Sequence, residues 1–262
     1  MNGGAAGSGP PGSGSPEPLA LFRAYPELSE ALDGLAAGAT WCMTGASALL
    51  CDGEHWLFEL TKPKSWRRRA DGSVVVGIGA IGGSLEGGET ILDCLRREVA
   101  EEIGAGLAVR SAPQTYIVHE RRDVHVADLP QRPFPRPALL TVSANLYRRH
   151  LRPECEILAI ATFLARLEGR AELCDIYGLL RVPQAALEAV LLRGSTPGQI
   201  SGEQIAGEPL AREPISRDEL AAIPGVSWQT REPLPERAVL APVWTVHSLQ
   251  VLLRAGHTLG CV

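Results

Sequence analysis

The spacing of apolar and polar residues along the chain predicts alternating strands and helices. Two apolar runs, residues 44–53 and 54–60, predict a pair of strands around the hairpin signal Asp52-Gly53. Apolar residues at helical spacing predict a helix that begins at Pro26 and another that begins after Thr90. Further strands are predicted over residues 73–81, 107–120, 138–147, 156–167 and 177–183, and further helices over 183–192, 217–222 and 243–254.

This interleaved order favours an α/β fold in which helices lie on both faces of a mixed sheet. Residues 1–18 are rich in Gly, Pro and Ser and offer little to bury, which predicts a disordered tail. We therefore expect one domain over residues 19–262, with its core at about 41–193 and a C-terminal elaboration at 194–262. A surface loop is expected over residues 194–215.

Charge and hydropathy exclude some classes of partner. The net charge of −5 and the isoelectric point near 5.7 argue against non-specific binding to DNA, which needs a basic face. No apolar run approaches the roughly 18 residues that cross a bilayer, so no membrane is expected as a partner. The N-terminal stretch lacks the apolar segment of a signal peptide, and the expected location is the cytoplasm.

Six cysteines are scattered along the chain without a CxxC pair. In a cytoplasmic protein of this size we expect them to be reduced and, in several cases, buried as small hydrophobic residues. A zinc site is not expected from this spacing. The cysteines are Cys42, Cys51, Cys94, Cys155, Cys174 and Cys261.

The helix after Thr90 carries the strongest chemical signal. Thr90 is suited to cap its start and Gly104 to end it. Glu98, Glu101 and Glu102 then lie on one side of the helix within about a turn, where they repel one another unless a cation sits among them. Carboxylate oxygens are the ligands that Mg²⁺ and Mn²⁺ prefer. The preceding glycine pair lets the backbone approach a metal or a phosphate closely.

The same stretch resembles the Nudix box, from Gly83 to Ala105. Gly83 is followed after five residues by Glu89, then after seven residues by Arg97-Glu98, and the motif ends on Glu101-Glu102 and Gly104. Ala105 replaces a bulkier aliphatic residue, and Ile81 stands where many members carry proline, but neither position supplies a ligand.

This resemblance implies the Nudix fold, a mixed sheet between helices, and a metal-dependent pyrophosphohydrolase. Its substrate would be a small molecule in which a nucleoside diphosphate is linked to another moiety. Glu98, Glu101, Glu102 and the carbonyl of Gly82 would bind Mg²⁺ or Mn²⁺. Glu98 or Glu102 would also orient or deprotonate the attacking water. Gly83, Glu89, Arg97 and Gly104 would support the box, with Glu89 and Arg97 as a structural pair.

Members of the family often add an acidic residue from outside the box, and the sequence does not choose among the candidates Glu120, Glu154, Glu156, Glu168, Glu172 and Asp175. Lys62, Lys64, Trp66 and Arg67 precede the strand that leads into the box. They are candidates for substrate binding, with Trp66 stacking on a base, or else a solvated basic loop. Residues 121–137 form either a lid or a flexible insertion. His119 and His125 are not assigned to catalysis.

Two other functions stay open. A Nudix fold that senses a nucleotide ligand without turning it over is the first alternative, although such proteins tend to lose box carboxylates that this chain keeps. The second is an isomerase of prenyl diphosphates, which requires a cysteine opposite a glutamate, whereas Cys94 lies on the box helix itself. The identity of the substrate is not readable from the box, and a homodimer is possible for such hydrolases.

Overall fold

Two long apolar strands form the centre of the sheet. The computed structural model of the protein describes residues 18–146, 153–192 and 214–261. Strands β1 (Trp41–Asp52) and β10 (Ile157–Glu168) run parallel to each other along most of their length. Successive side chains of a strand point to opposite faces, and nearly every residue of β1 is buried, so this part of the sheet is covered on both faces.

The other elements surround this pair. The helices are α1 (Pro18–Ala24), α2 (Pro26–Ala36), α3 (Ile91–Ile103), α4 (Leu187–Leu191), α5 (Arg217–Ala221) and α6 (Trp244–Arg254), with 3-10 turns at Pro63–Ser65 and Gln184–Ala186. The other strands are β2 (His55–Leu60), β3 (Arg67–Arg68), β4 (Val74–Gly79), β5 (Ile81–Ser84), β6 (Gly106–Arg110), β7 (Thr115–His119), β8 (Asp123–Ala127), β9 (Leu139–Ala144), β11 (Gly178–Pro183), β12 (Ile215–Ser216), β13 (Ser227–Thr230) and β14 (Ala238–Pro242).

These strands form one mixed sheet. Its main path runs β12-β14-β4-β2-β1-β10-β9-β7-β8, and β3, β5, β6, β11 and β13 pair off this path. The predicted strand over residues 73–81 is divided at Ala80, where the chain leaves its pairing with β2 as β4 and joins β1 as β5. The sheet therefore splays at this point, and the split lies directly before the box helix.

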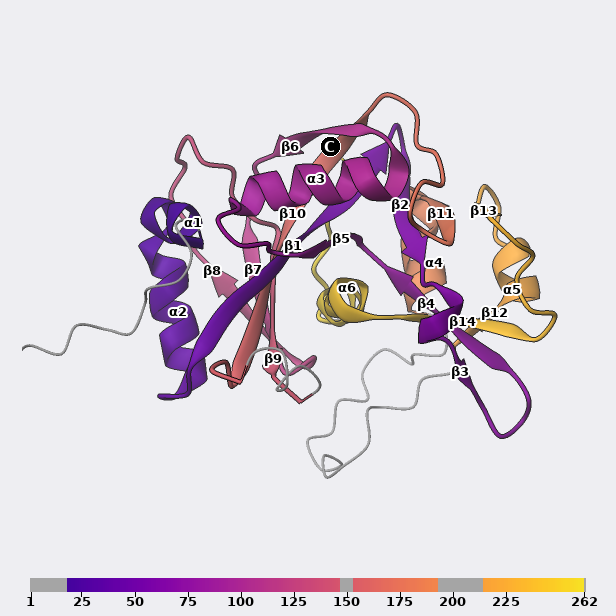
Figure 1. Cartoon of the computed structure of the whole chain (residues 1–262), viewed down its shortest axis with the longest axis horizontal. Coiled ribbons are helices and arrows are strands. Elements are labelled where there is room, and N and C mark those ends of the chain that lie inside the picture. The colour runs from indigo at the N-terminus through magenta and orange to yellow at the C-terminus, as the bar shows by residue number, and fades with distance from the viewer. Residues whose placement is uncertain (1–17, 147–152, 193–213, 262) are drawn as a thin grey trace, which may run out of the picture.

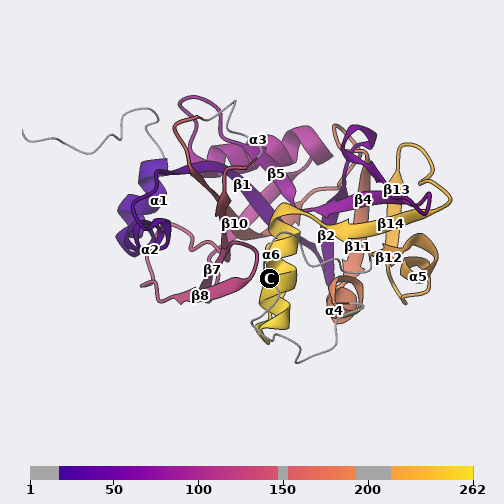
Figure 2. The same cartoon turned by 90° about the horizontal axis from the view of Figure 1, so that it is seen from below.

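Helices cover both faces of the sheet, as the α/β/α expectation has it. The box helix α3 packs on β5, β1 and β6, while α6 packs on the opposite face against β9, β7 and β4. Figures 1 and 2 show the two helices on opposite sides of β1 and β5. The C-terminal segment is part of the same sheet, because β14 pairs in parallel with β4.

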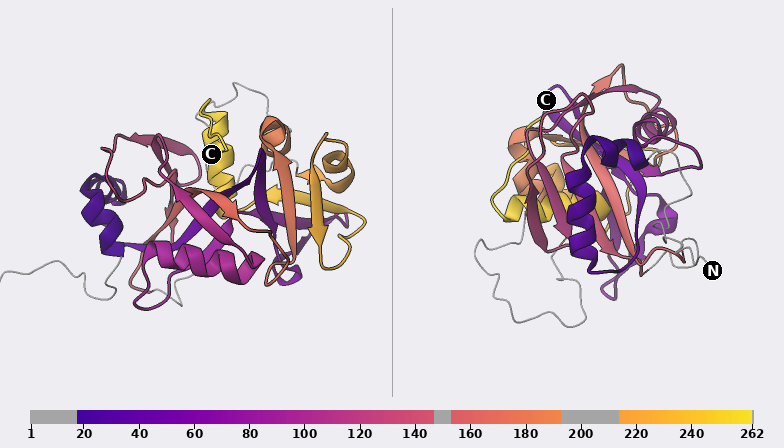
Figure 3. Two further views of the ribbon diagram at one scale, coloured as in Figure 1. Left: turned by 90° about the horizontal axis from the view of Figure 1, so that it is seen from above. Right: turned by 90° about the vertical axis from the view of Figure 1, so that its left-hand side faces the viewer.

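The N-terminal helices α1 and α2 lie at one end of the molecule (Figure 3) and fix the loop that follows β8. The hydroxyl of Tyr25 donates a hydrogen bond to the carbonyl of Phe134 at 2.6 Å, and Arg132 forms an ion pair with Glu27 at 3.0 Å. The expectation of a lid or flexible insertion at 121–137 is therefore wrong, since its first part is β8 and its second part is held by these contacts.

Two expectations fall partly outside the described residues. The predicted tail does so for residues 1–17, whereas Pro18 begins α1; the predicted loop at 194–215 does so for residues 194–213. None of the helices in the described ranges is long and apolar enough to cross a membrane.

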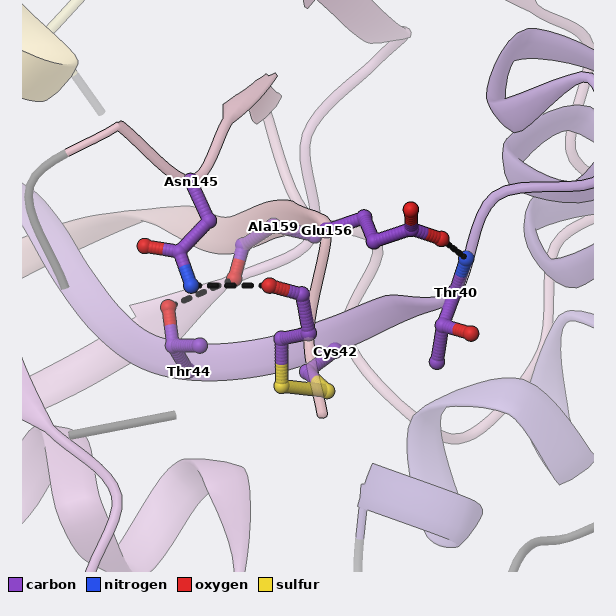
Figure 4. Close-up of a disulfide and its surroundings, with 7 residues drawn as sticks. Thr40, Cys42, Thr44, Asn145, Glu156 and Ala159 are labelled. Carbon is purple, nitrogen blue, oxygen red and sulfur yellow. Dashed lines mark hydrogen bonds between the residues drawn. A yellow bond between two sulfur atoms is a disulfide. The ribbon is translucent and has the colours of Figure 1, made fainter. Parts of the chain in front are cut away.

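Four of the six cysteines contradict the expectation of reduced thiols, whereas Cys94 and Cys174 are free. Cys42 forms a disulfide with Cys155 and Cys51 with Cys261, each with Cα atoms 5.6 Å apart. Figure 4 shows the first disulfide beside the hydrogen bond from the Thr40 amide to the Glu156 carboxylate. The partners are separated by 113 and 210 residues, so only the pairing of distant strands and the return of the C-terminus bring them together.

Candidate active site

The box helix α3 begins and ends at the residues that its sequence predicts. The side chain of Thr90 accepts a hydrogen bond from the Asp93 amide at 2.9 Å and caps the first turn. Gly104 ends the helix at φ 63°, a conformation that favours glycine. The apolar face of the helix is buried against the sheet, which leaves the carboxylates at its edge. Buried on that face are Ile91, Cys94, Leu95, Val99 and Ile103.

Arg97 connects the acidic residues of the box to one another. Its Nε and Nη2 atoms donate to the two carboxylate oxygens of Glu89 at 2.7 and 3.0 Å. Its Nη1 atom donates to Glu98 at 3.0 Å and to Glu101 at 3.1 Å, and Nη2 reaches the Ser84 carbonyl. The hydrogen bonds from Arg97 lower the pKa of Glu89. The guanidinium thus fixes the helix to the preceding loop and orients Glu98.

The glycine pair before the helix makes room for two close approaches. A Cβ atom on Gly82 would clash with the backbone of β1 at Ala46 and Ser47, and Gly82 has φ 148°. A Cβ atom on Gly83 would occupy the position of the Glu98 carboxylate. The amide of Gly82 also donates to the Glu102 carboxylate at 3.1 Å. Glycines are needed here because carboxylates and backbone meet directly.

Burial shifts the ionisation of the carboxylates at this turn. It raises the pKa of Glu102 to about 8, and the negative charge of Glu59 adds to the effect. Burial also raises the pKa of Glu98, although the hydrogen bond from Arg97 opposes this. Carboxyl groups that are desolvated and close to one another hold their protons to a higher pH. A group of neighbouring carboxylates of this kind favours the binding of a cation.

Glu59 is the acidic residue that the sequence interpretation missed. It lies on β2, mostly buried, where burial raises its pKa to about 7, Lys62 opposes the shift and Glu98 adds to it. A Cβ atom on Gly79 would lie 2.5 Å from the Glu59 carboxylate, so glycine at that position leaves space for the side chain. A signal existed in HWLFEL, where Glu59 is the one charged residue of a strand that is otherwise mostly apolar.

The six acidic candidates named from the sequence lie elsewhere or at the rim. Asp175 comes nearest, through an ion pair with Lys62 at 2.7 Å that lowers the pKa of Asp175. Glu120 accepts a hydrogen bond from the Ala144 amide and Glu156 one from the Thr40 amide. Of the remaining three, Glu154 lies beside the Cys42–Cys155 disulfide, Glu168 beside Gly106, and Glu172 beside the end of α3.

Of the basic loop, Lys62 reaches the carboxylates, since its charge lowers the pKa of both Glu59 and Glu102. Trp66 packs edge-on against Tyr177, with ring centroids 5.1 Å apart, and its indole N–H donates to the Thr61 carbonyl. Arg67 is exposed on β3, and Lys64 is exposed in the 3-10 turn before it.

A pocket of about 210 Å³ opens beside the glycine turn, at the split in the sheet. On the side of the box it is lined by Glu59, Gly79, Gly82, Gly83 and Ser84. Glu59 is thus part of the lining, and Gly82 and Gly83 adjoin the Glu102 and Glu98 carboxylates. The pocket next to the box is large enough for part of a small ligand.

The residues at this site suit a hard divalent cation. The donors are carboxylate oxygens, which Mg²⁺ and Mn²⁺ prefer, and burial raises the pKa of Glu98 and of Glu102. Arg97 Nη1 holds both Glu98 and Glu101, so a cation would compete with the guanidinium for these two groups.

Another group of possible ligands does not form a metal site. In the part of the chain that the structure describes, the ligand atoms of Cys42, Glu154 and Cys155 lie within 4.8 Å of one another, closer together than the box carboxylates. The two sulfurs are joined in a disulfide, which leaves no thiolate to bind a metal.

Comparison with known proteins agrees with the box. Residues 43–166 match the family model of the NUDIX domain, a range that includes α3, the glycine turn and Glu59. This match and the box residues from Gly83 to Ala105 point to the same family of domains. No curated protein matches the chain.

Three solved structures are similar to the chain at low identity. The E. coli ORF135 protein is 12% identical with a TM-score of 0.32, and the match covers 58% of this chain and 81% of that one. A MutT protein from Bacillus halodurans is 17% identical with a TM-score of 0.30 and coverages of 56% and 72%. A NUDIX hydrolase from Nitrosomonas europaea is 15% identical with a TM-score of 0.34 and coverages of 61% and 82%. These structures carry no further argument, and the resemblance to Nudix hydrolases rests on the family model and on the box residues.

Proposed function

We propose that the protein is a metal-dependent pyrophosphohydrolase that cleaves the diphosphate linkage of a nucleoside diphosphate joined to another moiety. The observation that carries this proposal is the meeting of Glu59, Glu98 and Glu102 at the Gly82–Gly83 turn, beside a pocket. A set of desolvated carboxylates next to unobstructed backbone suits a ligand that brings both cations and phosphate.

The proposed reaction transfers a phosphoryl group to water. The water oxygen forms a bond to one phosphorus atom while the bridging P–O bond breaks, and the water proton passes to a carboxylate. Mg²⁺ or Mn²⁺, bound by Glu98, Glu101, Glu102 and the Gly82 carbonyl, would neutralise phosphate charge and lower the pKa of the water. Glu98 or Glu102 then orients the water and accepts its proton.

Glu59 and Lys62 complete the proposed site. Glu59 shares the desolvated space with Glu102 and is proposed as an additional carboxylate from outside the box. Lys62, half-exposed at the rim, is proposed to bind phosphate oxygens in place of its present partner Asp175. Arg97 is proposed as a positioning residue, because its side-chain contacts go to box carboxylates and to the Ser84 carbonyl, and Arg97 does not itself line the pocket.

The alternatives fit the structure less well. Burial raises the pKa of Cys94 to about 12, and its thiol donates to the carbonyl of Gly83. A thiol that stays protonated on the buried face of α3 is poorly suited to the acid–base exchange of an isomerase. A sensor without turnover has no need for the full set of box carboxylates, all of which are present.

Location and assembly stay predictions. The sequence favours the cytoplasm, whereas two disulfides are more typical of proteins in an oxidising compartment. We keep a small nucleoside diphosphate derivative as the proposed partner, without DNA, and a homodimer as a possible assembly.

The test is turnover of a panel of nucleoside diphosphate compounds with Mg²⁺, Mn²⁺ or EDTA, read as released nucleoside monophosphate. We expect hydrolysis of at least one compound, lost with EDTA and restored by added metal. Metal-dependent binding of a panel member without hydrolysis of any would favour the sensor and overturn the proposal.

A further inference from the structure

Part of the pocket lining comes from the C-terminal segment. Trp244 and Thr245, the first residues of α6, line the pocket together with Thr44, Ser47 and the residues of the glycine turn. Both lie outside the range that matches the NUDIX domain. Trp244 and Thr245 therefore belong to a part of the chain for which the resemblance to the Nudix box implies no role.

The backbone at Trp244 is fixed on both sides. Before it, the amide of Val243 donates to the Ile78 carbonyl at 2.9 Å, which continues the parallel pairing of β14 with β4. After it, the hydroxyl of Thr245 lies 3.0 Å from that of Ser47, which in turn lies 2.9 Å from that of Thr162. These three hydroxyl-bearing residues are buried, so α6 is anchored to the two central strands at the pocket.

Trp244 combines an unusual backbone conformation with an exposed side chain. Its φ of 48° is in the left-handed region, which bulky residues rarely adopt, and its side chain is 42% exposed. Strained backbone of this kind is concentrated at ligand sites, where the surrounding structure holds it in place. The indole is the one aromatic group among residues that line the pocket, and its neighbours there are small.

We propose that Trp244 is the platform on which the base of the nucleotide stacks, with the diphosphate at Glu59 and the Gly82–Gly83 turn, which line the same pocket. This inference rests on the proposed function for the class of ligand. An exposed indole beside small residues offers a flat face to a planar ring, and such stacking is tolerant of which base is present. Trp244 would supply affinity for an aromatic group, while the box supplies the chemistry.

The test measures binding of the four nucleoside 5′-monophosphates and of ribose 5-phosphate by calorimetry, with Mg²⁺ present. Stacking contributes about 1–3 kcal/mol per base, so Trp244→Ala should weaken binding of a nucleotide by roughly 5- to 150-fold. Trp244→Phe should retain part of the affinity. Binding of ribose 5-phosphate should not change in either variant.

Two further variants separate recognition from folding. Trp244→Gly relieves the positive φ, so it should fold at least as well as Trp244→Ala and still lose nucleotide affinity. Trp228→Ala removes a half-buried tryptophan of β13, outside the pocket lining, and should bind nucleotides like the wild type. Equal affinity of the wild type for nucleotides and ribose 5-phosphate, or unchanged nucleotide binding in Trp244→Ala, would overturn the platform.

Failure of the platform is distinguishable from failure of the proposed hydrolysis. If the wild type hydrolyses a panel compound and Trp244→Ala does so with unchanged kcat/KM, the hydrolase stands and the platform is wrong. If nucleotide binding depends on Trp244 but no compound is hydrolysed, the platform stands and the hydrolase is wrong.

Discussion

The box helix α3 and the start of α6 contribute to the site in different ways. The box supplies charged groups from one continuous stretch of the chain, and Arg97 connects Glu89, Glu98 and Glu101 in a single network. The start of α6 supplies neutral groups, the indole of Trp244 and the hydroxyl of Thr245. Hydrogen bonds there join Ser47, Thr162 and Thr245, which come from three distant parts of the chain. The proposed chemistry on a diphosphate needs several charges at fixed spacing, and one helix can supply them. Recognition of the rest of a ligand is left to surfaces assembled by the fold.

The largest effect on activity should come from substituting the carboxylates of the box. We expect Glu98→Gln and Glu102→Gln to lower kcat by about 10²–10³-fold or more, because each removes a negative oxygen that holds the cation or the water. Nucleotide binding through Trp244 should persist in both variants, as measured by calorimetry. Glu188→Gln, an exposed position on α4, is the control and should retain activity. Wild-type kcat in Glu102→Gln would remove that residue from catalysis.

The Cys51–Cys261 disulfide constrains the segment that follows α6, and its contribution to stability can be measured. Cys51 lies on β1 and Cys261 follows α6, so their bond ties the end of the chain to the centre of the sheet. The pair of substitutions Cys51→Ser and Cys261→Ser should lower the free energy of unfolding by about 2–5 kcal/mol, because the denatured chain regains loop entropy.

The same measurement, denaturant unfolding, applies to Cys42→Ser with Cys155→Ser, with a loss of similar size. Cys174→Ser, at an exposed free thiol, is the control and should not change stability. A wild type that unfolds identically with and without a reductant would contradict both pairings.

A smaller effect on activity is expected from Glu59, which lines the pocket but lies outside the box. Glu59→Gln should lower kcat by about 10- to 100-fold, since it keeps the shape of the side chain and removes one of the desolvated charges. Steady-state kinetics at saturating metal measures this. Glu54→Gln, exposed in the turn of the same hairpin, should behave like the wild type. Activity in Glu59→Gln equal to that of the control would leave Glu59 without a role in the reaction.

The smallest effect is on the stability of the metal-free protein as pH changes. The folded pKa values of Glu59 and Glu102, about 7 and about 8, lie above the ordinary value of 4.5. Stability from these groups is fully present below about pH 4.5 and is lost as pH rises through 7 and 8, because the unfolded state releases their protons first.

Thermal unfolding in EDTA should therefore show a Tm that falls by a few degrees between about pH 5 and 8. Glu102→Gln should flatten the profile, and saturating Mg²⁺ should raise Tm most at the high-pH end. The Glu54→Gln control should keep the wild-type slope. A flat wild-type profile in EDTA would contradict the raised pKa values.

The sequence by itself determined the box and the elements of local pattern. The helix between Thr90 and Gly104 was predictable because its caps, its apolar face and its carboxylates all depend on residues within a few turns of one another. The same holds for the hairpin at Gly53, for the two layers of helices and for the final helix, predicted at 243–254 and found at Trp244–Arg254.

Tertiary structure alone decided which residues from outside the box join the site. Glu59 belongs to the site because β2 leaves β1 and pairs with β4 at Gly79, and Trp244 belongs to it because β14 pairs with β4 across most of the sequence. The disulfides likewise join cysteines 113 and 210 residues apart. Local spacing carries no signal for such contacts, because the free energy that brings these segments together comes from burying a shared core, to which each contributes only a short, unremarkable run of residues.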